Sequence, residues 1–160
     1  MYVTKNDIPE ATRTKVIGLL NERLADAIDL QTQCKQAHWN VRGPDFIALH
    51  KLFDEITEDA EEYVDLIAER AIQLGGSVQG TARSVAKRTT LPEYNAASDR
   101  GHDHVQAMSV ALSSFGKLAR AGIDATTEWR DAGTADLFTE ISRGVDKWLW
   151  MVEAHLQTDK

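Results

Sequence analysis

Two histidines and three carboxylates in the first half of the chain are residue types that bind transition-metal ions. They are His38, His50, Asp54, Asp65 and Glu69. Neutral imidazoles and carboxylates together suit iron, zinc or manganese, and a ligand set of two imidazoles and one carboxylate leaves coordination positions open. The sequence therefore predicts a reactive metal site, provided that the fold brings these side chains together.

Most of these residues lie on one face of a predicted helix. Residues 43–45, Gly-Pro-Asp, interrupt one helical pattern and start another, because proline suits the first helical position and aspartate suits the positive end of the helix dipole. At about 100° per residue, six polar side chains then share one stripe, and the apolar side chains lie opposite. The stripe consists of His50, Asp54, Glu58, Glu61, Asp65 and Glu69. A solvated helix face is the alternative interpretation of such a charge run.

His38 favours a metal site over a solvated face. It precedes Pro44 by six residues and His50 follows Pro44 by six, so a helical hairpin at this turn places the two imidazoles at the same level. Asp54 lies one helical turn beyond His50. These three side chains could bind one metal ion.

Asp65 and Glu69 form a second carboxylate pair, about 16 Å beyond Asp54 at a rise of about 1.5 Å per residue. Asp54 and the second carboxylate pair of the same chain are therefore too far apart to bind one metal ion. If two copies of the helix pack antiparallel around residues 58–62, His50 and Asp54 of one chain meet the second carboxylate pair of the other. The chain also lacks the Glu-x-x-His pairs of intrachain di-iron bundles. We therefore expect sites that are shared between subunits.

At these residues the chain resembles the Dps family, small ferritin-like proteins named for DNA protection in starved cells. The segments KQAHWNVRGPDFIALHKLFDE, AERAIQLGG and DKWLWMVEAHL carry the resemblance, which extends over nearly the whole chain. The resemblance implies an all-α, ferritin-like fold. It further implies a homo-oligomer in which dimers build a hollow dodecameric shell.

The resemblance also implies ferroxidase activity, the oxidation of Fe(II). Fe(II) would bind through His38, His50 and Asp54, Glu69 of the partner subunit would complete the site, and Asp65 would help to hold a second iron or a water. Hydrogen peroxide would be the preferred oxidant, Fe(III) would be stored as a mineral, and zinc or manganese could substitute for iron. The competing hypothesis is a non-enzymatic shell protein that compacts DNA or has a structural role, with a vestigial metal site.

Helical periodicity predicts four long helices in a single domain of residues 1–160. We expect the first helix from a capping box of Asp7 and Glu10 to about His38, the second over about 45–74, the third from about Ser98 to Gly122, and the fourth from a cap at Thr134 to about Leu156. Residues 124–133 are predicted to form a turn. Residues 77–94 would join the second and third helices and contain a short helix. The expected architecture is a four-helix bundle with one long crossover.

The charge balance bears on partners and location. The net charge is −7, from 18 basic and 25 acidic residues, which argues against broad affinity for nucleic acid. Lys5 is the only lysine before the first helix, so we expect DNA binding to be weak or absent. Arg83, Lys87 and Arg88 are expected to be solvated or to contact another subunit. The chain lacks the apolar core of a signal peptide and a membrane-length apolar run, so we expect a cytoplasmic protein, with nucleoid association as a variant.

Some single residues have specific expected positions. We expect Cys34, the sole cysteine, to be a packing residue, and Lys35 either to pair with an acidic ligand or to lie on the surface. Three histidines are expected at the surface, namely His102, His104 and His155. Three tryptophans are expected to pack in the core, at the site or at an interface, namely Trp39, Trp148 and Trp150. Asp131 and Asp136 align with the acidic pore region of the Dps family.

Overall fold

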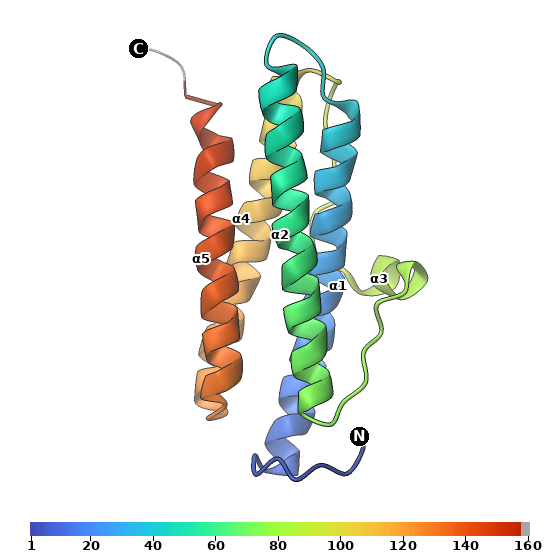
Figure 1. Ribbon diagram of the computed structural model, residues 1–160, viewed down its shortest axis with the longest axis vertical. Coiled ribbons are helices and arrows are strands. Elements are labelled where there is room, and N and C mark those ends of the chain that lie inside the picture. Colours follow the sequence, from blue (N-terminus) through green and yellow to red (C-terminus); the bar gives the residue numbers. More distant parts are fainter. Residues whose placement is uncertain (158–160) are drawn as a thin grey trace.

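The computed structural model describes residues 1–157 and contains four long helices and one short one (Figure 1). The helices are α1 (Glu10–Asn40), α2 (Phe46–Gln73), α3 (Ala82–Arg88), α4 (Gly101–Glu128) and α5 (Ala132–Ala154). No β-strand occurs in residues 1–157, where the only bridge pairs Arg42 with Arg100. The predicted all-α bundle with a short helix in a long crossover is confirmed.

The topology follows from the lengths of the connections. Short turns make α1 and α2 antiparallel, and likewise α4 and α5, whereas the crossover after α2 returns along the bundle so that α4 runs parallel to α2 (Figure 1). The short helix α3 lies beside α1, outside the four-helix core (Figure 1). None of the helices in residues 1–157 is long and apolar enough to cross a membrane.

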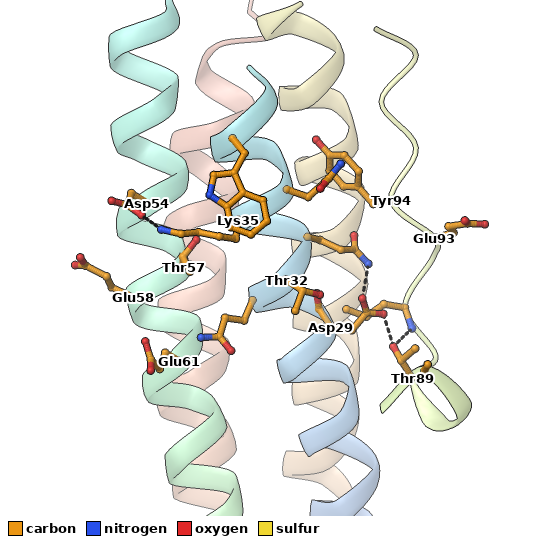
Figure 2. A pocket seen from close by; sticks show the side chains of 16 residues that line it. Asp29, Thr32, Lys35, Asp54, Thr57, Glu58, Glu61, Thr89, Glu93 and Tyr94 are labelled. Atoms are coloured by element: carbon orange, nitrogen blue, oxygen red, sulfur yellow. Dashed lines mark hydrogen bonds and ion pairs between the residues drawn. The ribbon is translucent and has the colours of Figure 1, made fainter. Parts of the chain in front are cut away.

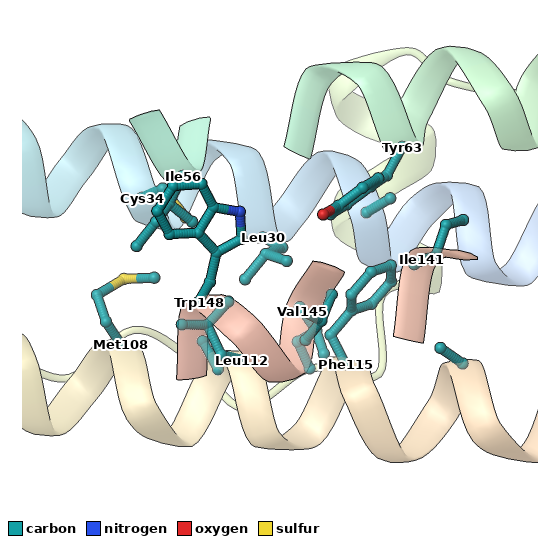
Figure 3. Packing of buried hydrophobic residues seen from close by; sticks show 14 of the residues in the cluster. Leu30, Cys34, Ile56, Tyr63, Met108, Leu112, Phe115, Ile141, Val145 and Trp148 are labelled. Carbon is teal, nitrogen blue, oxygen red and sulfur yellow. The ribbon is translucent and has the colours of Figure 1, made fainter. Parts of the chain in front are cut away.

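The core is built from the apolar faces of the four long helices (Figure 3). Phe53, Phe115 and Phe138 are almost completely buried in it. Cys34 is also buried, as predicted for a packing residue, and Trp148 packs in the core while its indole N–H donates to Asp59 Oδ2 over 2.6 Å. The apolar periodicity in the sequence therefore identified the buried faces correctly.

Three helix ends differ from the sequence prediction. The residue preceding α1 is Pro9, and no side-chain hydrogen bond caps this end, so the predicted capping box of Asp7 and Glu10 does not form. α4 continues to Glu128, beyond the predicted end at Gly122. Gly122 does not end the helix, because it is buried where a Cβ would lie 2.9 Å from the Phe138 ring, and the glycine allows this close packing.

The turn between α4 and α5 is shorter than the predicted turn over 124–133. Arg130 adopts a positive φ of 63° in this turn, and α5 already begins at Ala132. The residue that caps α5 is Asp131, whose carboxylate accepts from the Thr134 backbone N–H over 3.0 Å. The prediction of Thr134 as the cap was therefore wrong by three residues, because both residue types can cap and only the backbone geometry selects one.

His104 is buried rather than exposed as predicted, with 1% of its surface accessible. Its ring lies under the crossover and meets the hydroxyl of Tyr94. The two-residue spacing from His102 correctly placed these two histidines on different faces of α4, but the sequence did not reveal which face the crossover covers. His102 and His155 are exposed, as predicted.

Candidate metal centre

His38 and His50 meet at the corner between α1 and α2. Their rings stack with centroids 3.7 Å apart and an angle of 22° between the planes. The Nδ1–H of His38 donates to the backbone carbonyl of His50 over 2.8 Å, and the Nδ1–H of His50 donates to the carbonyl of His38 over 2.9 Å. In a neutral imidazole, a proton on Nδ1 leaves the lone pair on Nε2, and metal-binding imidazoles are commonly oriented in this way by a backbone carbonyl.

The corner itself is fixed by its backbone. Gly43 has a φ of 116°, a left-handed conformation that favours glycine, and its carbonyl accepts from the Phe46 N–H over 3.1 Å. The ring of Phe46 then lies 5.0 Å from the His50 ring, centroid to centroid. The sequence analysis missed Phe46, although its spacing of four residues before His50 on the same helix could have indicated the contact.

Asp54 follows His50 by one helical turn and forms an ion pair with Lys35 (Figure 2). The hydrogen bond from Lys35 is the main reason why the pKa of the Asp54 carboxyl lies below its ordinary value, with a smaller contribution from His38 and His50. Asp54 Oδ1 also lies 3.7 Å from His38 Nδ1. Of the two positions expected for Lys35, the structure shows the pairing with an acidic residue of the predicted site.

Asp65 and Glu69 lie on the same helix, exposed and separate from these groups. Asp65 follows Asp54 by 11 positions, or about 16 Å along the helix. Within residues 1–157, no three His, Cys, Asp or Glu side chains form a cluster that could hold a metal ion. The structure therefore brings His38, His50 and Asp54 to one corner of a single chain and leaves the other two predicted ligands apart.

A groove opens beside Asp54, between α1, α2, α3 and the crossover (Figure 2). Its volume is about 1170 Å³. Lys35, Glu58 and Glu61 line it together with Trp39, of which 68% is exposed in the chain. Trp39 thus does not pack within its own chain, and Trp150, with 69% exposed, does not either. The polar stripe of α2 and the exposed Trp39 share one open face of the bundle.

Asp131 does not have the position of a pore residue. Only 2% of it is exposed, and its Oδ1 accepts from Arg70 over 2.8 Å. Its Oδ2 accepts from the hydroxyl of Thr134 over 2.5 Å. Both oxygens are therefore engaged inside the chain, so Asp131 offers no free carboxylate oxygen to a passing ion in this structure. Asp136, the other residue of that expectation, is exposed.

Comparisons with known proteins agree with this fold. The protein-family model described as a ferritin-like domain matches residues 17–160 of this chain. A DNA protection during starvation protein from Agrobacterium fabrum is 44% identical over 156 residues, which cover 98% of this chain and 96% of the relative. The Dps structure from Mycobacterium smegmatis superimposes with a TM-score of 0.93 at 29% identity, covering 98% of this chain and 96% of the other.

A Dps structure from Vibrio cholerae, described as a member of the ferritin-like diiron-carboxylate proteins, has a TM-score of 0.89 at 25% identity and covers 98% of both chains. The fold thus defines a ferritin-like protein, a class that stores iron. Within this class, the chain belongs to the Dps family.

Proposed function

We propose that this protein is a ferroxidase and iron store that oxidises Fe(II), preferentially with hydrogen peroxide, at sites shared by two subunits. The Fe(III) would be deposited as a mineral inside a hollow dodecamer, which protects the cell from oxidative damage. The observation that carries the proposal is the pair of reciprocal hydrogen bonds between His38 and His50, because they orient both imidazoles through Nδ1 at the corner where Asp54 Oδ1 lies 3.7 Å from His38 Nδ1.

A second subunit would supply the missing ligands. The exposed Asp65 and Glu69 lie on the stripe that also carries His50 and Asp54, at its opposite end. A two-fold axis near residues 58–62 would place the His50 end of the stripe in one chain against the Glu69 end in the other. The symmetry repeats this contact, so a dimer would contain two such sites. The open groove beside Asp54 leaves room for the partner on this face.

The chemistry of the proposed reaction explains how it would protect the cell from oxidative damage. Two Fe(II) ions give one electron each, so that 2 Fe(II) + H₂O₂ + 2 H⁺ yields 2 Fe(III) + 2 H₂O without release of a hydroxyl radical. His38 and His50 would bind iron through Nε2, while Glu69 of the partner subunit would complete the site and Asp65 would help to hold the second iron. Lys35 is bound to Asp54 Oδ1 in the chain, so it would compete with a metal ion for that oxygen. Zinc or manganese would compete for the same ligands.

We also propose that DNA binding is weak or absent and that the protein acts in the cytoplasm. The backbone N–H of Tyr2 donates to the Gly75 carbonyl over 2.9 Å, and Arg13 donates to the Leu74 carbonyl over 2.9 Å. The N-terminal segment is therefore bound to the end of α2, and it carries only Lys5. A gel shift at physiological salt and submicromolar protein would contradict this part of the proposal.

The experiment that tests ferroxidase activity compares wild type with His50→Ala. The rate of Fe(II) oxidation by hydrogen peroxide is followed by the absorbance of Fe(III). We expect His50→Ala to lower the rate by about 100-fold or more, since loss of a mere hydrogen-bond partner of a metal ligand costs about 10- to 100-fold and His50 would itself be a ligand. The matched control is His102→Ala, which removes an exposed histidine of α4 and should retain the wild-type rate. Equal rates in His50→Ala and wild type would instead support a non-enzymatic shell, and native mass spectrometry tests for the dodecamer.

A further inference from the structure

His104 is a buried titratable group with an incomplete set of hydrogen bonds. Its Nδ1 meets the hydroxyl of Tyr94, and the two rings lie 6.1 Å apart, centroid to centroid, at an angle of 24°. Its Nε2 is buried and has no hydrogen-bond partner within residues 1–157. Only one of the two ring nitrogens therefore has a hydrogen-bond partner in the described chain.

Tyr94 belongs to a part of the crossover that has few other attachments. Before it, the Pro92 carbonyl accepts from Gln33 Nε2 over 3.0 Å. After it, the Asp99 carbonyl accepts from the Arg42 N–H over 2.8 Å. Over the described chain, the contact with His104 is the only hydrogen bond between residues 93–97 and a helix. Tyr94 thus fastens the middle of an irregular segment to α4.

The groups around His104 act in opposite directions on its charge. Asp99 of the crossover, Asp103 of α4 and the backbone carbonyl of Asn40 at the end of α1 favour the imidazolium. Burial disfavours it more strongly, so the pKa of His104 lies below the ordinary histidine value. A protonated ring would place two N–H donors in this site, where Tyr94 engages one nitrogen.

We propose that the Tyr94–His104 contact is an acid-sensitive latch, and that protonation of His104 releases residues 93–99 of the crossover from the helices, including the attachment of Asp99 to Arg42. The direction follows from linkage, because a histidine whose pKa is lowered by folding stabilises the closed state at neutral pH. This stabilisation is lost as the pH falls from about 6.5, the ordinary pKa of histidine, towards the lower pKa of His104 in the closed state. Over this range the equilibrium constant for opening should rise by up to about tenfold per pH unit. Neither Tyr94 nor His104 is a proposed metal ligand, so the latch does not rest on the proposed oxidation.

Cys34 provides an internal reporter of the latch. It is the sole cysteine, it is buried, and it follows Gln33, whose Nε2 donates to the Pro92 carbonyl of the crossover. Its reaction with 4,4′-dithiodipyridine is measured between about pH 7.5 and about pH 5, around the ordinary pKa of histidine. Each rate is divided by that of glutathione at the same pH, which removes the intrinsic pH dependence of the thiol. The normalised rate should rise by up to about tenfold per pH unit below about 6.5.

Three variants separate the latch from general acid effects. His104→Gln keeps a polar group beside Tyr94 but cannot titrate, so its normalised rate should not vary with pH. His102→Gln removes an exposed histidine two residues away and should keep the wild-type profile. Tyr94→Phe should react fast throughout the pH range, because the attachment itself is lost. A flat wild-type profile, or a His104→Gln profile like that of wild type, would overturn the proposal.

A second measurement needs no variant. The Arg42 N–H donates to the Asp99 carbonyl at the end of the crossover, so its hydrogen exchange reports release of this segment in the wild-type protein. After correction for the intrinsic exchange rate, we expect its protection to fall below about pH 6.5, whereas amides in the middle of α4 should keep theirs. Unchanged protection of Arg42 would contradict the latch even if the His104 variant does not fold.

Discussion

The two ends of the polar stripe on α2 differ in how far a single chain prepares them for metal binding. At the first end, His38 and His50 are held by each other's backbone carbonyls, and Gly43 fixes the turn between them. At the other end, Asp65 and Glu69 are exposed and make no hydrogen bond or ion pair in the described chain. The nitrogens are therefore oriented before any ion or partner arrives, whereas the carboxylates stay hydrated until another group meets them.

The backbone at the second end is nevertheless fixed. Arg70, the residue after Glu69, donates to Asp131 over 2.8 Å and to the hydroxyl of Thr134 over 2.9 Å. The last turns of α2 are thus attached to the start of α5, although the neighbouring Glu69 side chain remains exposed. A rigid helix that presents free carboxylates is suited to completing a site on a second chain, and the following predictions test this comparison.

The largest expected effect comes from mixing two inactive variants. His50→Ala and Glu69→Gln should each lose most of the peroxide-dependent oxidation of Fe(II), since each removes one half of every site. If the halves come from different chains, a mixed dimer contains one site with both defects and one intact site. Co-refolding equal amounts should then restore about a quarter of the wild-type rate, because half of the dimers are mixed and half of their sites are intact.

The control for mixing is the double variant His50→Ala with Glu69→Gln, co-refolded with either single variant. No intact site can form in that mixture, so the rate should stay at the level of the inactive parents. Native mass spectrometry of the mixtures checks that the chains have exchanged. Exchanged subunits without recovered activity would show that the two ends of the stripe do not meet across an interface.

The second effect concerns the attachment of α2 near Glu69. Asp131→Ala leaves Arg70 without its partner in a largely buried place and removes the cap of α5. We expect the free energy of unfolding to fall by about 3 kcal/mol, the usual scale for breaking a buried ion pair. Urea denaturation measures this change, and Asp136→Ala, which alters an exposed carboxylate five residues later, should change it by less than about 0.5 kcal/mol. A loss as small as that of the control would show that the attachment contributes little.

The smallest effect concerns the first end, where Lys35 occupies the Asp54 carboxylate. Lys35→Met removes a competitor of the metal ion, so zinc affinity at neutral pH should rise by about two- to fivefold, the scale of a partly exposed ion pair. The variant also raises the pKa of Asp54 towards its ordinary value, because the main cause of its lowering is lost. Protons should then displace zinc at a higher pH than in wild type.

Isothermal titration calorimetry of zinc binding across a pH series measures both changes for Lys35→Met. Lys51→Met is the matched control, because it removes an exposed lysine of α2, one residue after His50, that has no ion pair in the described chain. Weaker zinc binding in Lys35→Met than in the control would mean that the ion pair positions Asp54 rather than competing with the metal.

Local sequence patterns were enough to predict the helical bundle and which residues lie at the two ends of the polar stripe on α2. Apolar periodicity identified the four long helices, and the equal spacing of His38 and His50 from Pro44 predicted that their rings come together, as their stacking confirms. Sharing of Asp65 and Glu69 between subunits stays a prediction. Helix ends were less predictable, since α4 passes Gly122 and Asp131 caps α5 instead of Thr134.

The sequence by itself determined which residues form helices and which faces those helices bury, because both depend on spacing within one segment. Apart from the meeting of His38 and His50, only the tertiary structure decided which side chains meet across segments. It buried His104 under Tyr94, paired Lys35 with Asp54, and engaged Asp131 with Arg70. These contacts join residues distant in the chain or depend on the path of an irregular crossover, and their energies arise only when folding removes the groups from water.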